Sequence, residues 1–400
     1  MRIVILGAGQ AAAAMAARLR SRGHTGPLTV IGAEPVAPYQ RPPLSKAYLL
    51  GQMSLDRLTL RAPDWWTDQQ IDLRLGETAL SIDPAARIVT TDTGSHPYDA
   101  LALTLGAAPR RLPQAMGGHL PGTHVIRDLR DIDALAPALQ PGARLAVIGG
   151  GYIGLEAAAV ARTLGLDVTL IEAAPRILGR VAATQTADMI RQLHLSHGVT
   201  LLEGTGITRI TGEDRATGIA LTDGRQIPAD LVIQGIGVLP RTDLAHAAGL
   251  SLDNGIATDL TGRTSDPAIW AAGDCASFPH QGAQLRLESV GGAIDMAECV
   301  ADNILGQPRQ LTARPWFWSD QFDTKLQIAG LNAGHDHVVT RPGANAHSGS
   351  VWYFRQTTLI AVDALNDPRA YMIGKRLIEA GRSPDPSLIP TTPDLKTLLT

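Results

Sequence analysis

The stretch that decides the fold is RIVILGAGQAAAA, Arg2 to Ala14, because its glycines fall where a strand turns into a helix. Four apolar residues predict a strand over Ile3–Leu6, and the alanine-rich run predicts a helix over Ala11–Arg22 that stops at Gly23. Another apolar run predicts a second strand over Leu28–Ile31. The unit is typical of a nucleotide-binding strand–helix–strand segment.

The small residues in this unit have separate roles. Gly7 permits the tight turn, Gly9 lets a pyrophosphate approach the backbone, and Ala12 lets the helix pack closely on the strand. The free N–H groups at the start of the helix then face the phosphates. Glu34 follows the second strand, where a carboxylate can hold a ribose diol.

A second copy of the unit begins more than a third of the way along the chain, in VIGGGYIGLEA. Its parts are the strand Leu145–Ile148, the glycines Gly149, Gly151 and Gly154, the helix Tyr152–Leu164, the strand Asp167–Ile171 and the terminal acid Glu172. One such pattern is weak evidence, but here each copy has the strand, the helix and the downstream acid. Two dinucleotides in one chain indicate an electron relay in which one stays bound and the other exchanges.

Composition narrows the class of protein. A net charge of −3 over 400 residues gives no reason to expect nucleic acid or an anionic membrane as a partner. The two cysteines, Cys275 and Cys299, are far apart, which argues against a disulfide framework, a cysteine-built metal site and dithiol chemistry. The longest apolar runs fall short of the roughly 18–20 residues of a membrane helix. We expect a soluble, unprocessed, cytoplasmic protein.

Short strands alternating with helices predict an α/β fold with parallel sheets: two Rossmann-like dinucleotide-binding domains and a small α+β domain at the C-terminus. Pro/Gly-rich segments at Ala107–Gly122 and Gly235–Thr242 are candidate crossings between domains. Beyond about Ala313 the sequence becomes aromatic and alternating, as in WFWSDQFDTKLQIAG, and ends in a predicted helix near Met372–Ala380. We identify no internal repeat other than the two nucleotide units.

Several motifs together resemble a known family. They are, in order, APYQRPPLSKAYL (Ala37–Leu49), LTLGAAPR (Leu103–Arg110), VIGGGYIGLEAA, DLVIQGIGVLP, IWAAGDCA (Ile269–Ala276), ESVGGAIDMAE and WFWSDQFDTKLQIAG. The sequence is similar to the FAD-dependent NAD(P)H:ferredoxin reductases of the putidaredoxin-reductase type, which supply cytochrome P450s and aromatic-ring dioxygenases. The motifs span nearly the whole chain, and the combination of RPPLSK with GDCA is specific.

The resemblance implies a glutathione-reductase-like fold with an FAD-binding domain over 1–110 and 239–313, an NADH-binding domain over 111–238, and a C-terminal interface domain over 314–400. The first glycine loop would hold FAD permanently and the second would hold NADH transiently. A [2Fe–2S] ferredoxin would accept the electrons, and the chain would be a monomer or weak dimer. Rubredoxin reductase and an NADH-binding signalling flavoprotein of the same fold remain alternatives.

Two charged residues are the candidate catalytic pair. By resemblance, Lys46 of RPPLSK would lie near the flavin and pair with Glu156, while Arg41 would help to hold FAD. A lysine at the reactive edge of the flavin stabilises the electron-rich reduced ring. The alternatives are a plain surface loop for RPPLSK and an exposed helical acid for Glu156. The position of Glu156 beside the glycine loop favours a contact to the nicotinamide carboxamide.

Further residues are expected at the FAD. Asp274 of GDCA would accept from the ribityl hydroxyls. The helix that starts at Ser289 and Val290 and runs to Leu305 would direct its N–H groups at the flavin pyrimidine. Relatives usually read SVxNAxxQA there, so SVGGAIDMAE leaves only the backbone role intact. Relatives often carry two acids where this chain has Ala33 and Glu34, which leaves the backbone as an alternative to Glu34 at the adenosine ribose.

The other candidate contacts rest on matching positions alone. Ala11 and Ala79 would touch FAD through main-chain amides. Arg127 could contact FAD or be a surface arginine, and Trp318 could be a flavin-edge contact or, like Trp316, a core aromatic. Ile153 and Gly235 complete the NADH set. We expect NADH rather than NADPH, because Glu172 would repel a 2′-phosphate, although Arg176 or Arg180 could reach one. No metal ligand set is expected.

Overall fold

The computed structural model describes residues 1–345 and 347–399, and contacts between residues divide the chain into two compact units. Unit 1 comprises Met1–Arg41, Ser54–Ala108 and Val238–Pro315, and unit 2 comprises Pro42–Met53, Pro109–Gly237 and the chain from Trp316 onward. Two of the boundaries between units fall inside the Pro/Gly-rich segments noted in the sequence. Pro42–Met53, expected in the FAD domain, groups with unit 2, and the division of unit 2 into two domains stays a prediction.

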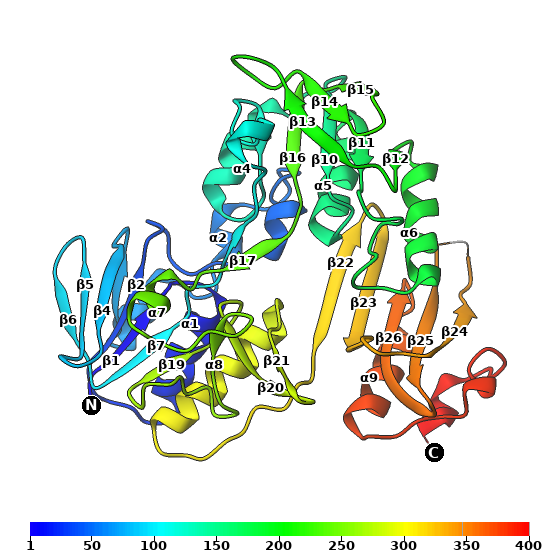
Figure 1. Cartoon of the computed structure of the whole chain (residues 1–400). Helices are drawn as coiled ribbons and strands as arrows, with labels where there is room; N and C mark the ends of the chain where they lie inside the picture. Colours follow the sequence, from blue (N-terminus) through cyan, green and yellow to red (C-terminus); the bar gives the residue numbers. More distant parts are fainter. Residues whose placement is uncertain (346, 400) are drawn as a thin grey trace. The chain divides into compact units, whose positions relative to one another are not determined.

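Unit 1 is built on a parallel five-stranded sheet in the order β19-β7-β1-β2-β3 (Figure 1). These strands are β19 (Ile269–Ala271), β7 (Ala100–Leu103), β1 (Ile3–Leu6), β2 (Leu28–Gly32) and β3 (Asp72–Leu75). Strands β1 and β7 are buried along their whole length, as parallel strands covered on both faces must be. Helices α1 (Gln10–Ser21) and α8 (Val290–Ile304) pack against each other.

A buried ion-pair network joins these two helices. The Asp302 carboxylate near the end of α8 has only 4% of its side chain exposed. It accepts from Arg18 at 2.8 and 2.7 Å, from Arg22 at 3.1 Å and from Arg309 at 3.2 Å. These hydrogen bonds, chiefly that from Arg18, hold the pKa of Asp302 below its ordinary value. The two helices are therefore held together by directional hydrogen bonds as well as by apolar packing.

Unit 2 repeats the design with a parallel sheet in the order β12-β11-β10-β16-β9. Its strands are β12 (Thr200–Leu202), β11 (Asp167–Ile171), β10 (Arg144–Ile148), β16 (Leu231–Gln234) and β9 (Thr123–His124). Helix α5 (Tyr152–Thr163) follows β10 as α1 follows β1. In both sheets the strand that precedes the glycine loop is central, flanked by the next strand along the chain and by a later one.

The duplication extends further than the sequence indicated. In each unit a three-stranded antiparallel meander comes just before the later strand that flanks the central one, β7 in unit 1 and β16 in unit 2. The meander is formed by β4 (Ala79–Asp83), β5 (Ile88–Thr91) and β6 (Ser95–Pro97) in unit 1 and by β13 (Ile207–Thr211), β14 (Gly218–Leu221) and β15 (Gln226–Pro228) in unit 2. These strands are short and largely polar on one face, so they carry little hydrophobic periodicity. The expectation that only the nucleotide segment repeats was therefore too narrow.

The C-terminal part of unit 2 is an antiparallel sheet in the order β22-β23-β26-β25-β24. It consists of β22 (Trp316–Gln321), β23 (Thr324–Gly330), β26 (Thr358–Leu365), β25 (Gly349–Arg355) and β24 (His337–Pro342), with helix α9 (Pro368–Glu379) packed on it. The helix begins four residues earlier than the predicted Met372 because Asp367 caps it through the Ala370 N–H and Pro368 occupies its first position. The predicted fold class is confirmed.

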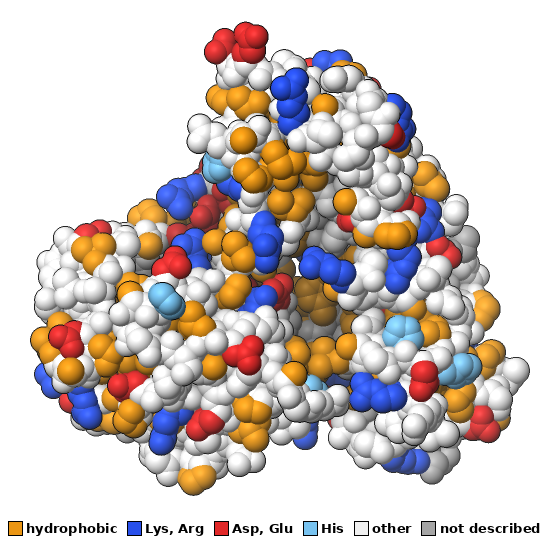
Figure 2. Space-filling model, in the orientation of Figure 1, with side chains coloured by type: hydrophobic (Ala, Val, Ile, Leu, Met, Phe, Trp, Pro, Cys, Tyr) orange, Lys and Arg blue, Asp and Glu red, His pale blue; other side chains and the backbone are white. Residues whose placement is uncertain are grey.

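The remaining elements are short connections, except for helix α6 (Thr184–Ser196). They include α2 (Leu55–Leu58), α3 (Pro63–Asp68), α4 (Leu129–Leu135), α7 (Asp243–Ala247), β8 (Ala107–Pro109), β17 (Val238–Pro240), β18 (Ile256–Ala257), β20 (Ala276–His280), β21 (Ala283–Leu285) and the 3-10 turn Pro42–Ser45. Basic and acidic side chains are interspersed over the visible face (Figure 2), in keeping with the net charge of −3. Within the described ranges, no helix combines the length and apolarity needed to cross a membrane.

Candidate functional site

The first glycine loop lies between β1 and α1 in unit 1. Gly7 has φ +103°, and a Cβ there would lie 2.2 Å from the carbonyl oxygen of Thr104, so only glycine fits. Gly9 is the residue that caps α1, and a Cβ there would meet no protein atom within 4 Å. The start of α1 therefore has no side-chain cap and adjoins open space, the arrangement that a pyrophosphate requires.

Two later segments of unit 1 pack beside this loop. A Cβ on Gly273 would lie 3.2 Å from the Ala11 Cβ in α1 and 3.8 Å from the Ala293 Cβ in α8. The GDCA segment and the start of α8 therefore meet at the first turn of α1. This places Asp274 and Val290, both expected at the FAD, on segments that adjoin the first loop. One N–H of α8 is satisfied internally, because Gly292 donates to the Ser289 hydroxyl at 3.0 Å.

Glu34, the acid expected at the adenosine ribose, lies in a hydrogen-bonded group with two neighbours. Arg41 donates to Glu34 Oε1 at 2.5 Å, and the Tyr39 hydroxyl donates to Oε2 at 2.6 Å. The structure thus brings together Glu34 and Arg41, which the sequence assigned to FAD separately. A carboxylate oxygen can accept more than one hydrogen bond, so the expected ribose contact stays a prediction.

The second glycine loop, between β10 and α5 in unit 2, has the same geometry. Gly149 has φ +104°, and a Cβ there would lie 2.4 Å from the carbonyl oxygen of Gly235. A Cβ on Gly154 would lie 2.1 Å from the Gly149 carbonyl oxygen, whereas one on Gly151 would meet no protein atom within 4 Å. Helix α5 also lacks a side-chain cap, and Ile153 in its first turn is 42% exposed. This loop fits a second dinucleotide.

Glu172 at the end of β11 is fixed by the backbone around this loop. Its Oε2 accepts from the Gly150 N–H and its Oε1 from the Ala174 N–H, both at 2.7 Å. These bonds hold a carboxylate beside the second loop, and its expected contact with the nucleotide ribose stays a prediction. A negative charge there disfavours a 2′-phosphate on the nucleotide ribose.

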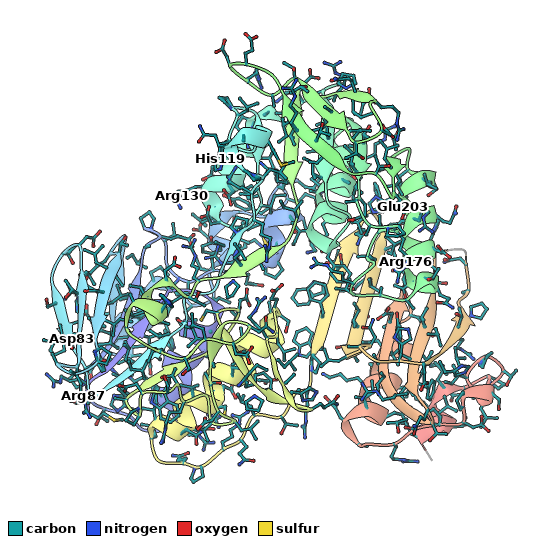
Figure 3. The ribbon with its side chains drawn as sticks, viewed as in Figure 1. Asp83, Arg87, His119, Arg130, Arg176 and Glu203 are labelled. Atoms are coloured by element: carbon teal, nitrogen blue, oxygen red, sulfur yellow. The ribbon has the colours of Figure 1, made fainter. Side chains whose placement is uncertain are left out.

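Arg176, which the sequence left as a possible phosphate ligand, is engaged by backbone carbonyls. Its Nη2 donates to the Ala182 carbonyl at 2.7 Å and its Nη1 to the Ile177 carbonyl at 3.4 Å. Arg176 lies on the same side of unit 2 as Glu203 (Figure 3). A hydrogen bond from Arg191 lowers the pKa of the Glu203 carboxyl, and the Arg176 charge adds a smaller effect in the same direction. The Arg176 guanidinium therefore bonds to the backbone of its own loop, whereas the Arg180 side chain is exposed.

The predicted pairing of Lys46 with Glu156 is present within unit 2. Lys46 Nζ lies 2.7 Å from Glu156 Oε2, with 14% and 1% of the two side chains exposed. The Ser45 hydroxyl donates to the same oxygen at 2.5 Å, and the Ser319 hydroxyl donates to Oε1 at 2.6 Å. Burial raises the pKa of Glu156, while the Lys46 charge and these hydrogen bonds lower it in part.

The sequence interpretation missed both hydroxyls, although each belongs to a motif that was singled out. Ser45 precedes Lys46 in RPPLSK, and Ser319 stands in FWSDQ. The alternative that Glu156 is an exposed helical acid is wrong, because the residue is buried on the face of α5 that packs against β22 and the Pro42–Ser45 turn.

Trp316 and Trp318 lie on one face of β22. Their rings are stacked with centroids 5.5 Å apart, and Lys375 lies 5.8 Å from the Trp316 ring. Both tryptophans are half-buried. The structure places Ala79 at the start of β4 and Arg127 just before α4, and the cofactor contacts proposed for these residues and for Trp318 stay predictions.

The two cysteines are free and buried, Cys275 after β19 and Cys299 in α8. Burial raises the pKa of each thiol to about 11, so neither is a thiolate at neutral pH. Across the residues that the structure describes, no three His, Cys, Asp or Glu side chains form a metal-binding group.

Comparison with known proteins assigns the chain to a family. Residues 1–297, which carry both glycine loops, match the pyridine nucleotide-disulphide oxidoreductases. The chain belongs to this family. Residues 316–399 match a reductase C-terminal domain. This pyridine nucleotide-disulphide oxidoreductase is therefore an enzyme that uses FAD and a pyridine nucleotide, and its two loops fit those cofactors.

Similar members of the family extend over the full length of the chain. A ferredoxin–NAD(P)⁺ reductase from Sphingomonas sp. is 42% identical over 404 residues, which covers 100% of this chain and 97% of the relative. Putidaredoxin reductase from Pseudomonas putida is 38% identical over an alignment that covers 97% of this chain and 94% of the relative. The crystal structure of a covalent putidaredoxin reductase–putidaredoxin complex matches with a TM-score of 0.95 and 37% identity, covering 100% of this chain and 98% of that one. The resemblance inferred from the sequence is confirmed.

Proposed function

We propose that this enzyme is a ferredoxin reductase that passes electrons from NADH through FAD to a [2Fe–2S] ferredoxin, which serves a cytochrome P450 or a ring-hydroxylating dioxygenase. The observation that carries the proposal is a pair of glycine loops, each followed by a helix without a side-chain N-cap, at Gly9 and at Gly151. They occur in a chain that matches a ferredoxin reductase over its whole length. The buried, widely separated cysteines supply no dithiol, which speaks against a disulfide substrate.

Each loop has its own dinucleotide in this proposal. Gly7, Gly9 and Ala12 hold the FAD pyrophosphate at the start of α1, and the adjoining Asp274 accepts from FAD hydroxyls. Gly149, Gly151 and Gly154 receive NADH at the start of α5. FAD supplies the ability to take two electrons as a hydride and to release them singly. The chain binds and orients the two partners and needs no nucleophile of its own.

Lys46 and Glu156 are the proposed catalytic pair. Glu156 accepts a hydrogen bond from the nicotinamide carboxamide and orients the ring. Lys46 supplies a fixed positive charge that stabilises the reduced flavin. The buried ion pair supports these roles, because burial raises the pKa of Glu156 and the Lys46 charge lowers it in part. A Lys46→Ala variant should therefore retain FAD but reduce it more slowly with NADH.

NADH is the proposed electron donor. The support comes from Glu172, whose carboxylate is held beside the loop by two backbone N–H groups, and from Arg176, which donates to backbone carbonyls. The carboxylate accepts from the two ribose hydroxyls of NADH and repels the 2′-phosphate of NADPH. A cytoplasmic location is part of the proposal, and the two free thiols suit a reducing compartment.

The acceptor surface is not set by the composition of the tail. From Trp316 onward the chain carries eight Lys and Arg residues and eight Asp and Glu residues, so no net charge attracts an acidic ferredoxin. Any docking patch must arise from the arrangement of these side chains in space.

The test is anaerobic stopped-flow mixing of the FAD-loaded enzyme with NADH, followed by a panel of [2Fe–2S] ferredoxins with rubredoxin and NADPH as comparisons. We expect the visible flavin absorbance to bleach with NADH and one NADH to reduce two ferredoxin molecules. An enzyme that fails to bleach would be a nucleotide-binding signalling flavoprotein instead. Faster reduction of rubredoxin than of every ferredoxin would move the proposal to rubredoxin reductase.

A further inference from the structure

A line of buried polar side chains leads from Glu156 to helix α6. We propose that Ser319, Gln321 and His194 form a hydrogen-bond array whose function is to position Glu156 and hold it in its ionised form. The three are positioning residues, because they act on the substrate only through Glu156. The inference rests on the proposed role of Glu156 at the nicotinamide and deepens it.

The array is continuous in distance and is closed to solvent. The Ser319 hydroxyl lies 2.6 Å from Glu156 Oε1, Gln321 Nε2 lies 3.0 Å from Ser319 Oγ, and His194 Nε2 lies 2.8 Å from Gln321 Oε1. Each of these four residues is at most 1% exposed. Ser319 and Gln321 are two apart on β22 and so share one face of the strand. Polar groups buried to this degree are costly unless they bond to one another.

The hydrogen bonds all run toward the carboxylate. The amide oxygen of Gln321 can only accept, so the Nε2 of His194 must carry the ring proton and donate. The amide nitrogen of Gln321 can only donate, so Ser319 accepts there and its single proton goes to Glu156. A chain with one direction polarises each successive donor, which strengthens the last bond. The array therefore favours negative charge on Glu156.

The charges around the array are consistent with this direction. Glu156 faces Lys46 beside the Pro42–Ser45 turn and Tyr152 on its own helix, and His194 faces His197. Burial lowers the pKa of His194 to about 4, so its ring is neutral at physiological pH and has a single proton, which Nε2 carries when it donates to Gln321. Lys46 secures one carboxylate oxygen and the array secures the other.

A second buried polar group on α6 provides a matched control. Thr186 donates to Asp363 Oδ2 at 2.7 Å and lies 3.1 Å from the Tyr353 hydroxyl. Thr186 is as buried as His194, and its hydrogen bonds run to Asp363 and Tyr353 rather than toward Glu156. A Thr186→Val change removes a buried hydrogen bond from the same helix without touching the array. It reports what loss of stability alone does.

The experiment follows the Glu156 carboxyl directly. FAD-loaded protein labelled with ¹³C at the glutamate side-chain carboxyl is titrated by NMR without NADH, and the Glu156 signal is assigned by its loss in Glu156→Gln. The variants are Ser319→Ala, which removes the last donor, Gln321→Met, which breaks the array at its centre, and Thr186→Val. Stopped-flow reduction by NADH is measured across the same pH range.

We expect Ser319→Ala to raise the titration midpoint by about one pH unit, which corresponds to one lost hydrogen bond to a charged group. Gln321→Met should raise it by about a third of a pH unit or more, because only the polarising part is lost. Thr186→Val should lower the melting temperature and leave the midpoint unchanged. The inference is overturned if Gln321→Met leaves the midpoint where Thr186→Val does, and Ser319→Ala decides alone if Gln321→Met does not fold.

Failure of the array and failure of the proposed function give different results. If Glu156→Gln and Lys46→Ala reduce flavin with NADH as fast as the wild type, the catalytic role of the pair is wrong. If both slow that step while Ser319→Ala and Gln321→Met leave the Glu156 titration unchanged, the pair stands and the array is refuted.

Discussion

The buried ion pair of Lys46 and Glu156 predicts a stability loss that depends on pH. A Lys46→Met substitution keeps most of the side-chain volume but leaves Glu156, 1% exposed, with hydroxyl donors only. Breaking one side of a buried ion pair costs roughly 3–5 kcal/mol, because the remaining charge stays out of water. We expect the low end, about 3 kcal/mol at neutral pH, since Ser45 and Ser319 continue to donate.

The sign of the pH dependence follows from the pKa of Glu156. Burial raises this pKa above the ordinary 4.5, and Lys46 lowers it again in part. A carboxyl whose pKa is raised by folding contributes stability below its unfolded pKa and loses that stability as the pH rises through the folded pKa. Removing Lys46 raises the folded pKa further. The loss caused by Lys46→Met should therefore be small in acid and grow toward neutral pH.

The measurement is urea unfolding followed by tryptophan fluorescence, at about pH 5 and about pH 8, for the wild type, Lys46→Met, Glu156→Gln and the double variant. Neutralising both partners should recover part of the loss, with a coupling energy of about 1–3 kcal/mol at the higher pH. The reasoning is refuted if Lys46→Met costs less than about 1 kcal/mol at both pH values, or if its cost is larger in acid.

Four further predictions concern other parts of the chain. Asp302→Ala, which strands three arginines, should lower the free energy of unfolding by roughly 3 kcal/mol in chemical denaturation, and the wild type should lose that contribution as the pH falls through the lowered pKa of Asp302. Gly151→Val should melt within about 2 °C of the wild type yet lose NADH binding in calorimetry, whereas Gly149→Ala should unfold more easily because its Cβ meets a carbonyl oxygen. Glu172→Gln should raise the rate of flavin reduction by NADPH relative to NADH roughly tenfold in stopped flow, which corresponds to about 1.4 kcal/mol of removed repulsion. Burial raises the pKa of Asp363 to about 6 from 3.8, so wild-type stability should fall as the pH rises through that interval, and thermal melts of Asp363→Asn should show a weaker fall.

The sequence predicted the parts of the fold in which local geometry and residue type coincide. Gly7 and Gly149 have positive φ in a tight turn, which is a local requirement, so the need for glycine there can be recognised in the sequence. The fully apolar strands beside them could be recognised in the same way. The two meanders could not, because three- to five-residue strands with exposed polar faces have too little periodicity.

The site was predicted in part for a similar reason. Lys46 and Glu156 were paired through the family resemblance, not through local pattern, since 110 positions separate them. Their hydroxyl partners follow no sequence rule, because Ser319 is 163 residues from Glu156 and any buried serine could have served. The bond between Glu34 and Arg41, only seven positions apart, was missed because both had been assigned to the cofactor.

Helix α6 is attached to the C-terminal sheet by directional bonds at both ends of its buried face. Thr186 bonds to Asp363 near its start, and His194 bonds to Gln321 near its end. Such hydrogen bonds tolerate little displacement of α6 along the sheet. In chimeras made from members of the family, α6 and the C-terminal sheet should therefore come from the same parent. A chimera that takes its C-terminal segment from a relative should accept it only when α6 is transplanted with it, even if every apolar contact is conserved. Searches for new ferredoxin specificity by exchange of this segment should therefore move both pieces as one module.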